Sequence, residues 1–259
     1  GADSIIAAAG ADTITSGDGA DVITAVGSGD NVITTGDDNG ADTVSGGSGD
    51  DQITITDSAG TTDGDGAAAD SSATDVILAN AGASNLGSDT ITGFDSGEDL
   101  YRFLDADTLK SDTSTGAGTW TESEITTVID GAAFDLTGLA ATNTTDIYEL
   151  IGGNTSSADL SSATDGSELL KLVANAGSTA GEFTVSVTED GVAGGTDADK
   201  FYVVAYDDGN AYLYHFANTE GGGDAAIDSD EISLVATFEG ISNGGLASGD
   251  IVVHSAAAA

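Results

Sequence analysis

Residues 10–24 read GADTITSGDGADVIT, in which one five-residue phrase occurs twice, nine residues apart. In each copy a glycine precedes an aspartate by two residues, and an isoleucine follows that aspartate by two residues. Related phrases recur through residues 1–56, and their starts are separated by 9, 9, 10, 11 and 9 residues. The six copies are GADSI (1–5), GADTI (10–14), GADVI (19–23), GDNVI (29–33), GADTV (40–44) and GDDQI (49–53).

This period predicts a β-solenoid, because it is too short for a helical repeat. Each unit is a glycine-rich turn followed by a very short strand, whose Ile or Val points into a narrow core. A single coil cannot bury that residue, so neighbouring coils must stack. We therefore expect a parallel β-roll over residues 1–95, continued by the looser copies ATDVI (73–77) and GSDTI (87–91). Residues 57–72 contain no apolar residue larger than alanine and are predicted to be a loop excursion.

The aspartates of the repeats are predicted to form rows along the roll. Successive half-coils lie on opposite sides, so residues about 18 apart stack, with Asp3 over Asp21 and Asp12 over Asp30 or Asn31. Carboxylates roughly 4.8 Å apart repel by roughly 0.9 kcal/mol in water, and by more at a lower dielectric. A calcium ion between coils converts this repulsion into coordination by carboxylate and backbone carbonyl oxygens.

The stretch GGSGDDQIT (46–54) matches the nine-residue pattern G-G-x-G-x-D-x-U-x of calcium-binding β-helices, where U is a large apolar residue. The alternative is a solvated Gly/Asp-rich linker that binds nothing, but such a linker has no reason to keep Ile or Val after each aspartate. The candidate calcium ligands are Asp3, Asp12, Asp21, Asp30, Asn31, Asp42, Asp50, Asp51 and Asp89.

The charge of the chain limits its partners. It has 259 residues with 45 acidic and 4 basic side chains, a formal net charge of −41. A nucleic-acid partner is excluded because phosphate backbones are bound by Lys and Arg. No apolar run approaches 18 residues, so we expect no membrane insertion. Cysteine is absent, which excludes disulfides and zinc–thiolate sites. No catalytic constellation is found either, so we expect that the chain is not an enzyme.

Residues 96–259 are expected to form a β-rich domain with one or two short helices. Residues 165–174 predict a helix, with Asp165 as N-cap and Glu168 three residues later. Residues 201–216 predict a hairpin around the turn 207–210. Further strands are predicted at 182–188, 232–238 and 250–255.

An acidic segment at 220–231 can be aligned with an EF-hand loop. Its ligand-type residues are Glu220, Asp224, Asp228 and Glu231, but Ala225 occupies the position where a glycine is expected. A bound ion and an acidic surface loop are the two alternatives for this segment.

The repeats resemble the RTX (repeats-in-toxin) family, and DTITGFDSGEDLYRF (89–103) resembles the end of such a repeat block. The resemblance is good over residues 1–104. The remainder more loosely resembles C-terminal regions of proteins exported by type I secretion, notably FYVVAYDDGNAYLYHF (201–216). Together these resemblances imply a C-terminal export signal within 96–259 and folding in extracellular calcium. The low-Lys, Cys-free composition is similar to that of RTX-containing bacterial surface-layer proteins.

Two functional hypotheses follow. The first is an extracellular structural protein on the surface of a Gram-negative-type bacterium, which self-assembles into a layer or filament in calcium, with cell-surface polysaccharide as a further candidate partner. The second is the export and folding tail of a secreted hydrolase or large adhesin. The chain opens within a repeat, at GADSII (1–6), which leads us to expect a fragment or a processed product.

Overall fold

The computed structural model of the chain is mainly β and contains a parallel β-roll, as the repeats predict. The structure describes residues 1–36, 40–56, 73–79, 87–103, 125–129, 133–135, 147–151, 158–174, 183–186, 200–217 and 229–253. The predicted excursion at 57–72 lies outside these residues. No helix among them is long and apolar enough to cross a membrane.

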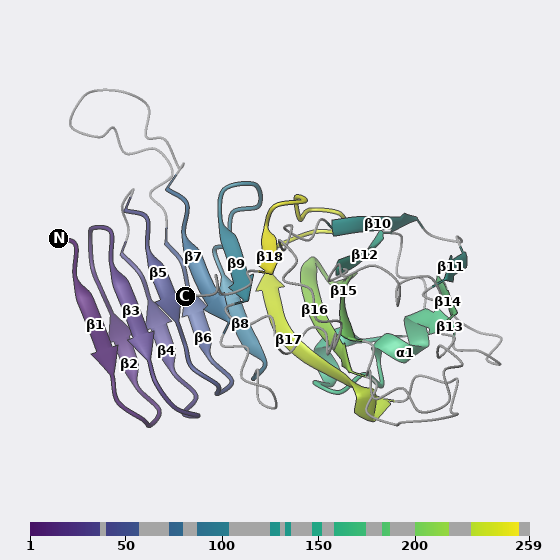
Figure 1. The fold of residues 1–259 in the computed structure, drawn as a ribbon, viewed down its shortest axis with the longest axis horizontal. Coiled ribbons are helices and arrows are strands. Elements are labelled where there is room, and N and C mark those ends of the chain that lie inside the picture. Colours follow the sequence, from purple (N-terminus) through teal and green to yellow (C-terminus); the bar gives the residue numbers. More distant parts are fainter. Residues whose placement is uncertain are drawn as a thin grey trace, which may run out of the picture.

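The roll is made of two parallel sheets whose strands alternate along the chain (Figure 1). Odd-numbered strands enter one sheet, called sheet A here, and even-numbered strands enter the other, called sheet B. Sheet A holds β1 (Ser4–Ala7), β3 (Val22–Ala25), β5 (Thr43–Ser45), β7 (Val76–Ala79) and β9 (Leu100–Phe103). Sheet B holds β2 (Thr13–Thr15), β4 (Val32–Thr34), β6 (Gln52–Thr54) and β8 (Asp89–Thr92).

One apolar column runs along the inner face of each sheet, because the strands pair in register. In sheet A the column is Ile5, Ile23, Val44, Ile77 and Tyr101. In sheet B it is Ile14, Ile33, Ile53 and Ile91. They form one buried cluster, on which Ile5 of the first coil packs partly buried. Each coil thus contributes one large apolar residue per side and relies on its neighbours for burial.

Strands from the C-terminal part of the chain extend both sheets. The chain returns so that β17 (Ile232–Glu239) pairs in parallel with β8, and β18 (Ile251–Val253) pairs in parallel with β9 (Figure 1). Beyond β17, sheet B continues through β16 (Asn210–Ala217), β15 (Lys200–Asp207), β12 (Ile147–Ile151) and β10 (Ile125–Ile129). A separate small sheet contains β11 (Ala133–Asp135), β14 (Phe183–Ser186) and β13 (Val173–Ala174).

The junction between the repeats and the C-terminal strands is aromatic. Phe94 and Tyr101 each contact Phe238 of β17 edge-on, with ring centroids 5.0 and 5.5 Å apart. Phe103 lies 4.5 Å from Tyr202 of β15, centroid to centroid. The predicted boundary near residue 95 falls between β8 and β9, both of which pair with C-terminal strands. One buried apolar cluster therefore includes residues from both sides of the predicted boundary.

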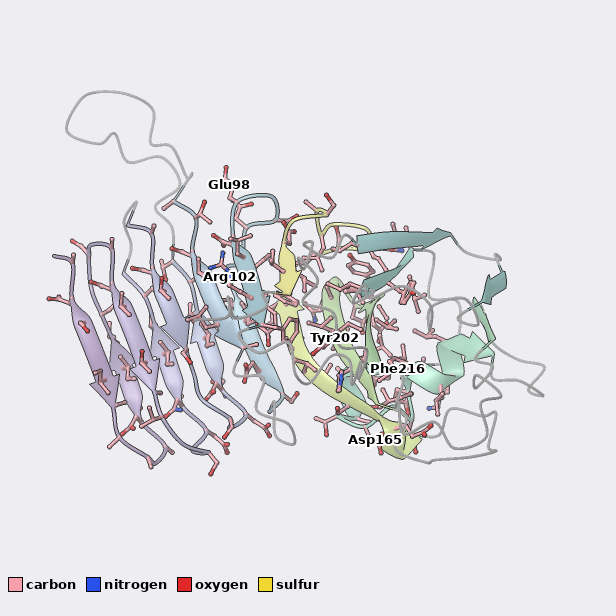
Figure 2. The ribbon with its side chains drawn as sticks, in the orientation of Figure 1. Glu98, Arg102, Asp165, Tyr202 and Phe216 are labelled. Carbon is pink, nitrogen blue, oxygen red and sulfur yellow. The ribbon has the colours of Figure 1, made fainter. Side chains whose placement is uncertain are left out.

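The predicted hairpin is present as β15 and β16, which pair from Lys200–Ala217 to Asp207–Asn210. Its two turn residues, Asp208 and Gly209, have φ of 46° and 81°, as a type I′ turn requires. Alternate residues face opposite sides: Tyr202 belongs to the cluster shared with the roll, and Phe216 to a second cluster (Figure 2). Burial on both faces explains why this hairpin is apolar almost throughout.

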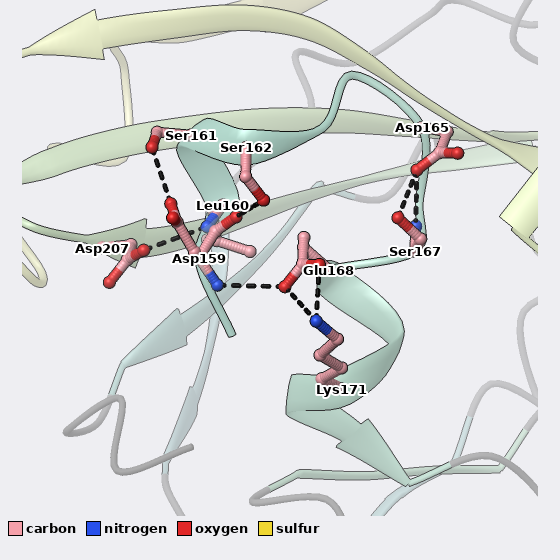
Figure 3. A network of polar contacts seen from close by, with 9 residues as sticks. All are labelled: Asp159, Leu160, Ser161, Ser162, Asp165, Ser167, Glu168, Lys171 and Asp207. Carbon is pink, nitrogen blue, oxygen red and sulfur yellow. Dashed lines mark hydrogen bonds and ion pairs between the residues drawn. The ribbon is translucent and has the colours of Figure 1, made fainter. Parts of the chain in front are cut away.

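The second cluster includes residues of α1 (Leu169–Leu172) and of the short 3-10 helix η3 (Leu160–Ser162). A second 3-10 helix, η4 (Ser229–Glu231), directly precedes β17. The helix predicted at 165–174 is shorter than expected, because Val173 already begins β13. Asp165 accepts hydrogen bonds from Ser167, whereas Glu168 binds Lys171 and the backbone N–H of Asp159 (Figure 3). The Ser167 N–H thus donates to the carboxylate of Asp165 at 3.0 Å, as expected of an N-cap, while Glu168 is engaged by Asp159 and Lys171.

Candidate calcium-binding rows

Five aspartates, called row A here, each directly precede an odd-numbered strand of the roll. Each side chain after the first accepts the backbone N–H of its equivalent in the preceding coil, at 2.6–3.0 Å from that nitrogen to Oδ1. Each backbone carbonyl before Asp99 also accepts an N–H from the following coil, as between Asp3 and Val22 at 2.9 Å. The members of row A are Asp3, Asp21, Asp42, Asp75 and Asp99.

Row B lies at the starts of the even-numbered strands and repeats this arrangement. Its members are Asp12, Asn31, Asp51 and Asp89, with Asp89 as the first residue of β8. The Asp12 N–H donates to Oδ1 of Asn31 at 2.9 Å, and the Asn31 N–H to Oδ1 of Asp51 at 2.8 Å. The Asp51 N–H donates to Oδ1 of Asp89 at 3.1 Å. The prediction of Asp3 over Asp21 is thus correct, and of the two candidates above Asp12 the structure selects Asn31.

The rows carry buried carboxylate oxygens for which the protein supplies no donor. Asp21 is 0% and Asp51 is 1% exposed. In both residues Oδ1 accepts a backbone N–H, while Oδ2 is buried without a hydrogen-bond partner, as is Oδ2 of Asp12. Leaving a buried charged oxygen unpaired is costly. Hard oxygen ligands of this kind fit calcium.

Backbone carbonyls would have to complete any such site. Within the described residues, no three His, Cys, Asp or Glu side chains come together in a geometry that could hold a metal ion. One cation between two coils would therefore use one or two carboxylates of a row, together with carbonyl oxygens of the glycine turns. This ligand set is compatible with calcium, which accepts carboxylate and carbonyl oxygens in flexible geometry.

Burial also raises the pKa of two carboxyl groups in row B. It raises the pKa of Asp51 to about 6, with nearby Asp30 and Asp50 adding to the rise and hydrogen bonds from Asn31 opposing it. Burial raises the pKa of Asp89 well above its ordinary value, and the charges of Asp51 and Asp50 act in the same direction. Without a cation, these aspartates are therefore held in the folded chain at an electrostatic cost.

Glycine is needed in the turns because successive coils touch through their backbones. A Cβ on Gly29 would lie 2.0 Å from the carbonyl oxygen of Gly10, and one on Gly49 would lie 2.4 Å from that of Gly29. Real Cβ atoms do not approach backbone so closely, so the coil spacing depends on these glycines. The aspartate rows are positioned by this close stacking.

Two predicted ligands, Asp30 and Asp50, lie outside rows A and B. Both are exposed, and Asp30 accepts the Asp50 N–H at 3.1 Å while Asp50 accepts the Ser88 N–H at 2.8 Å. They form a short outer row next to row B. Of the EF-hand-like segment, Glu220, Asp224 and Asp228 lie outside the described residues, so that prediction stays open.

Two members of row A, Asp75 and Asp99, are not among the predicted ligands. Both are about 1% exposed. Asp75 lies in the looser copy ATDVI, and Asp99 in GEDLY (97–101), which has the spacing of glycine, aspartate and apolar residue found in the other copies. The long interval after residue 54 breaks the period, so spacing alone did not identify them.

Asp250 ends row A. It directly precedes β18, and its carboxylate accepts three hydrogen bonds: from the Gly97 N–H at 2.8 Å, the Ser96 hydroxyl at 2.6 Å and the Ala247 N–H at 2.7 Å. The protein itself therefore satisfies this buried carboxylate, in contrast to Asp21 and Asp51.

Comparison with known families agrees with this geometry. A model of the RTX calcium-binding nonapeptide repeat, in four copies, matches residues 1–25 and 25–54. These coils are RTX repeats. The RTX match ends before β7, whereas the roll and row A continue through β9. The chain has no significant match among curated proteins or among solved structures.

The RTX repeats indicate a calcium-binding protein of a kind that is typically secreted. This agrees with the unpaired oxygens of the rows and with the charge of −41. Bound calcium would supply positive charge, which the sequence lacks.

Proposed function

We propose that this chain is an extracellular structural protein that self-assembles in calcium at a bacterial cell surface. The proposal is supported chiefly by the buried, unpaired carboxylate oxygens of rows A and B. In this proposal the row aspartates and the carbonyls of the glycine turns hold the calcium ions. Cytosolic calcium is scarce, so the chain stays unfolded and exportable until it reaches the outside, because ion binding and folding are coupled.

Net charge makes the assembly calcium-dependent. Copies that each carry −41 repel one another, and bound calcium reduces that charge. The outer faces then offer apolar contacts: Ile6 is 76%, Val22 is 47% and Val32 is 42% exposed. Ile6 and Val22 lie on sheet A and Val32 on sheet B. Copies can therefore pack through these faces once the repulsion is reduced.

Sedimentation velocity and electron microscopy, each with calcium and with EGTA, test the assembly. We expect large assemblies in calcium and dispersed chains in EGTA, with magnesium as a weaker substitute because it resists dehydration. The double variant Ile6→Thr/Val22→Thr keeps strand propensity and removes apolar contact area. It should bind calcium normally but assemble less. A chain that stays monomeric at high concentration in calcium would show that self-assembly is wrong.

A second candidate function is the folding and export module of a secreted hydrolase or adhesin. It is favoured by one observation: β17 and β18, near the end of the chain, cover the last strands of both roll sheets. A C-terminal segment that leaves the cell first could then start the folding of the roll. Fusion of an unrelated cargo in front of residue 1, with the export and calcium-dependent folding of that cargo as readouts, tests this alternative.

The cell surface is the proposed site of assembly, with polysaccharide as the proposed anchor. Cells stripped of the protein with EGTA should rebind it when calcium is restored, and soluble surface polysaccharide should compete with this rebinding. Absence of competition would exclude polysaccharide as the anchor and leave self-assembly unaffected.

A further inference from the structure

One position of the rows contains an amide where the equivalent positions contain a carboxylate. Asn31 is 3% exposed and lies in row B between Asp12 and Asp51. Its equivalent in row A is Asp21, which lies between Asp3 and Asp42. The two side chains therefore allow a direct comparison in the same local structure.

The first side-chain atom has the same role in both residues. Oδ1 of Asp21 accepts the Asp3 N–H at 2.6 Å, and Oδ1 of Asn31 accepts the Asp12 N–H at 2.9 Å. A backbone N–H can only donate, so the atom of Asn31 that faces Asp12 must be its oxygen. The orientation of the amide follows from this contact.

The second side-chain atom differs. In Asp21 it is Oδ2, which is buried and has no hydrogen-bond partner. In Asn31 it is Nδ2, which lies 2.8 Å from the Gly29 carbonyl oxygen, 2.8 Å from the Gly46 carbonyl oxygen and 3.0 Å from Oδ1 of Asp51. Three oxygen atoms thus surround an N–H donor at this position.

These three oxygens are of the kind that bind calcium: two turn carbonyls and one row carboxylate. The carboxylate of Asp51 also borders Gly46, since a Cβ there would lie 2.1 Å from Oδ2 of Asp51. The two hydrogens of an amide supply positive charge density to the oxygens without an ion. With aspartate at residue 31, a second carboxylate would instead face these oxygens, and the side chain would offer them no donor.

We propose that the Asn31 amide replaces a calcium ion at the contact between the coils that contain Gly29 and Gly49, so that this contact forms without metal. The proposal rests on the proposed role of rows A and B in binding calcium. Under this proposal, a coil contact such as that at Asp21 needs calcium to form, whereas the contact at Asn31 does not. The roll therefore contains a metal-independent contact on which further coils can stack.

The variant Asn31→Asp tests this directly. We expect it to bind one more calcium ion per chain than the wild type, counted by native mass spectrometry. In EGTA its urea midpoint, followed by far-ultraviolet circular dichroism, should fall below that of the wild type, and calcium should restore it. An unchanged ion count, or a variant that calcium fails to restore, would overturn the proposal.

Two further variants serve as controls. Asp21→Asn makes the opposite exchange at the equivalent position and should bind one ion fewer than the wild type. Asn31→Ala removes the amide without adding a carboxylate, so its ion count should equal that of the wild type while its urea midpoint falls in both buffers. A wild type that binds no calcium would instead refute the proposed function, which separates that failure from a failure of the Asn31 proposal.

Discussion

Buried acidic side chains fall into two groups according to what meets their oxygens. Asp250 and Glu149 are satisfied by the protein: Asp250 by three donors, and Glu149 of β12 by the hydroxyl of Tyr206, which donates to its Oε1. Asp21 and Asp51 each keep a buried oxygen with no donor. The first group is structural, whereas the unpaired oxygens of the second are the ones that the proposed calcium ions would satisfy.

Glu149 gives the fold a pH dependence that is separate from calcium. Burial raises its pKa above the ordinary 4.5, and the nearby charge of Asp250 adds to this, although the Tyr206 hydrogen bond opposes it. The folded state therefore holds this proton more tightly than the unfolded state does. Its contribution to stability is present below the ordinary pKa and is lost as pH rises through the raised folded value.

We predict that Glu149→Gln reduces the loss of stability as pH rises from the ordinary glutamate pKa of 4.5, because glutamine cannot ionise and its Oε1 can still accept from Tyr206. The measurement is urea unfolding of variant and wild type at rising pH and constant calcium. Tyr206→Phe is the matched control: it leaves the buried Glu149 without its donor and should cost about 1–3 kcal/mol. Equal pH slopes for wild type and Glu149→Gln would contradict the prediction.

At the scale of the elements, the stacking of coils depends on the glycine turns rather than on strand length. The strands of the roll are only three or four residues long, so few backbone hydrogen bonds hold each coil. The turns add backbone contacts between coils, and each row adds side-chain hydrogen bonds at the strand starts of its own sheet. A change at a turn should therefore disturb the roll as much as a change in its core.

We predict that Gly29→Ala destabilises the protein by about 3 kcal/mol, near the upper end for overpacking, because its Cβ would lie 2.0 Å from the Gly10 carbonyl oxygen. Gly17→Ala is the matched control in the same roll. Gly17 has φ of 83° but no atom within 4 Å of the added Cβ, so only the backbone cost of about 1–2 kcal/mol remains. Urea unfolding in calcium measures both, and equal losses would show that coil contact is unimportant.

At the scale of the whole molecule, the roll and the C-terminal strands share one core. The inner column of sheet A ends in Tyr101 and Ile251, and that of sheet B in Ile91 and Phe238. All six tyrosines lie at or after residue 101, whereas the RTX match ends at residue 54. A calcium-binding measurement therefore reports on the N-terminal coils. The tyrosine signal reports on the chain from residue 101 onward.

We predict a single cooperative unfolding transition in calcium, with far-ultraviolet circular dichroism and the near-ultraviolet tyrosine signal changing together. The physical reason is the continuous buried cluster, since opening one part exposes apolar surface of the other. Two separate transitions would contradict this and would favour independent domains with a boundary near residue 95.

The repeats alone predicted the roll, its alternating sides and most of both rows, because a regular period places each aspartate, glycine and isoleucine at a repeated position. The spacing did not determine whether Asp30 or Asn31 belongs to row B. Spacings of 10 and 11 residues leave the register uncertain by one residue, and a shift of one residue exchanges a buried side chain for an exposed one. Burial in the stacked coils selected Asn31.

The sequence by itself determined the parallel β-roll and the RTX repeats of its first coils, since that information lies in contacts about 18 residues apart that the period encodes. Only the tertiary structure showed that β17 and β18 extend both sheets, that Asp75 and Asp99 continue row A, and that the Asn31 amide faces three oxygens. Such contacts join segments up to about 150 residues apart in the chain. No local pattern encodes them, because they are decided by which apolar edges the whole fold can bury together.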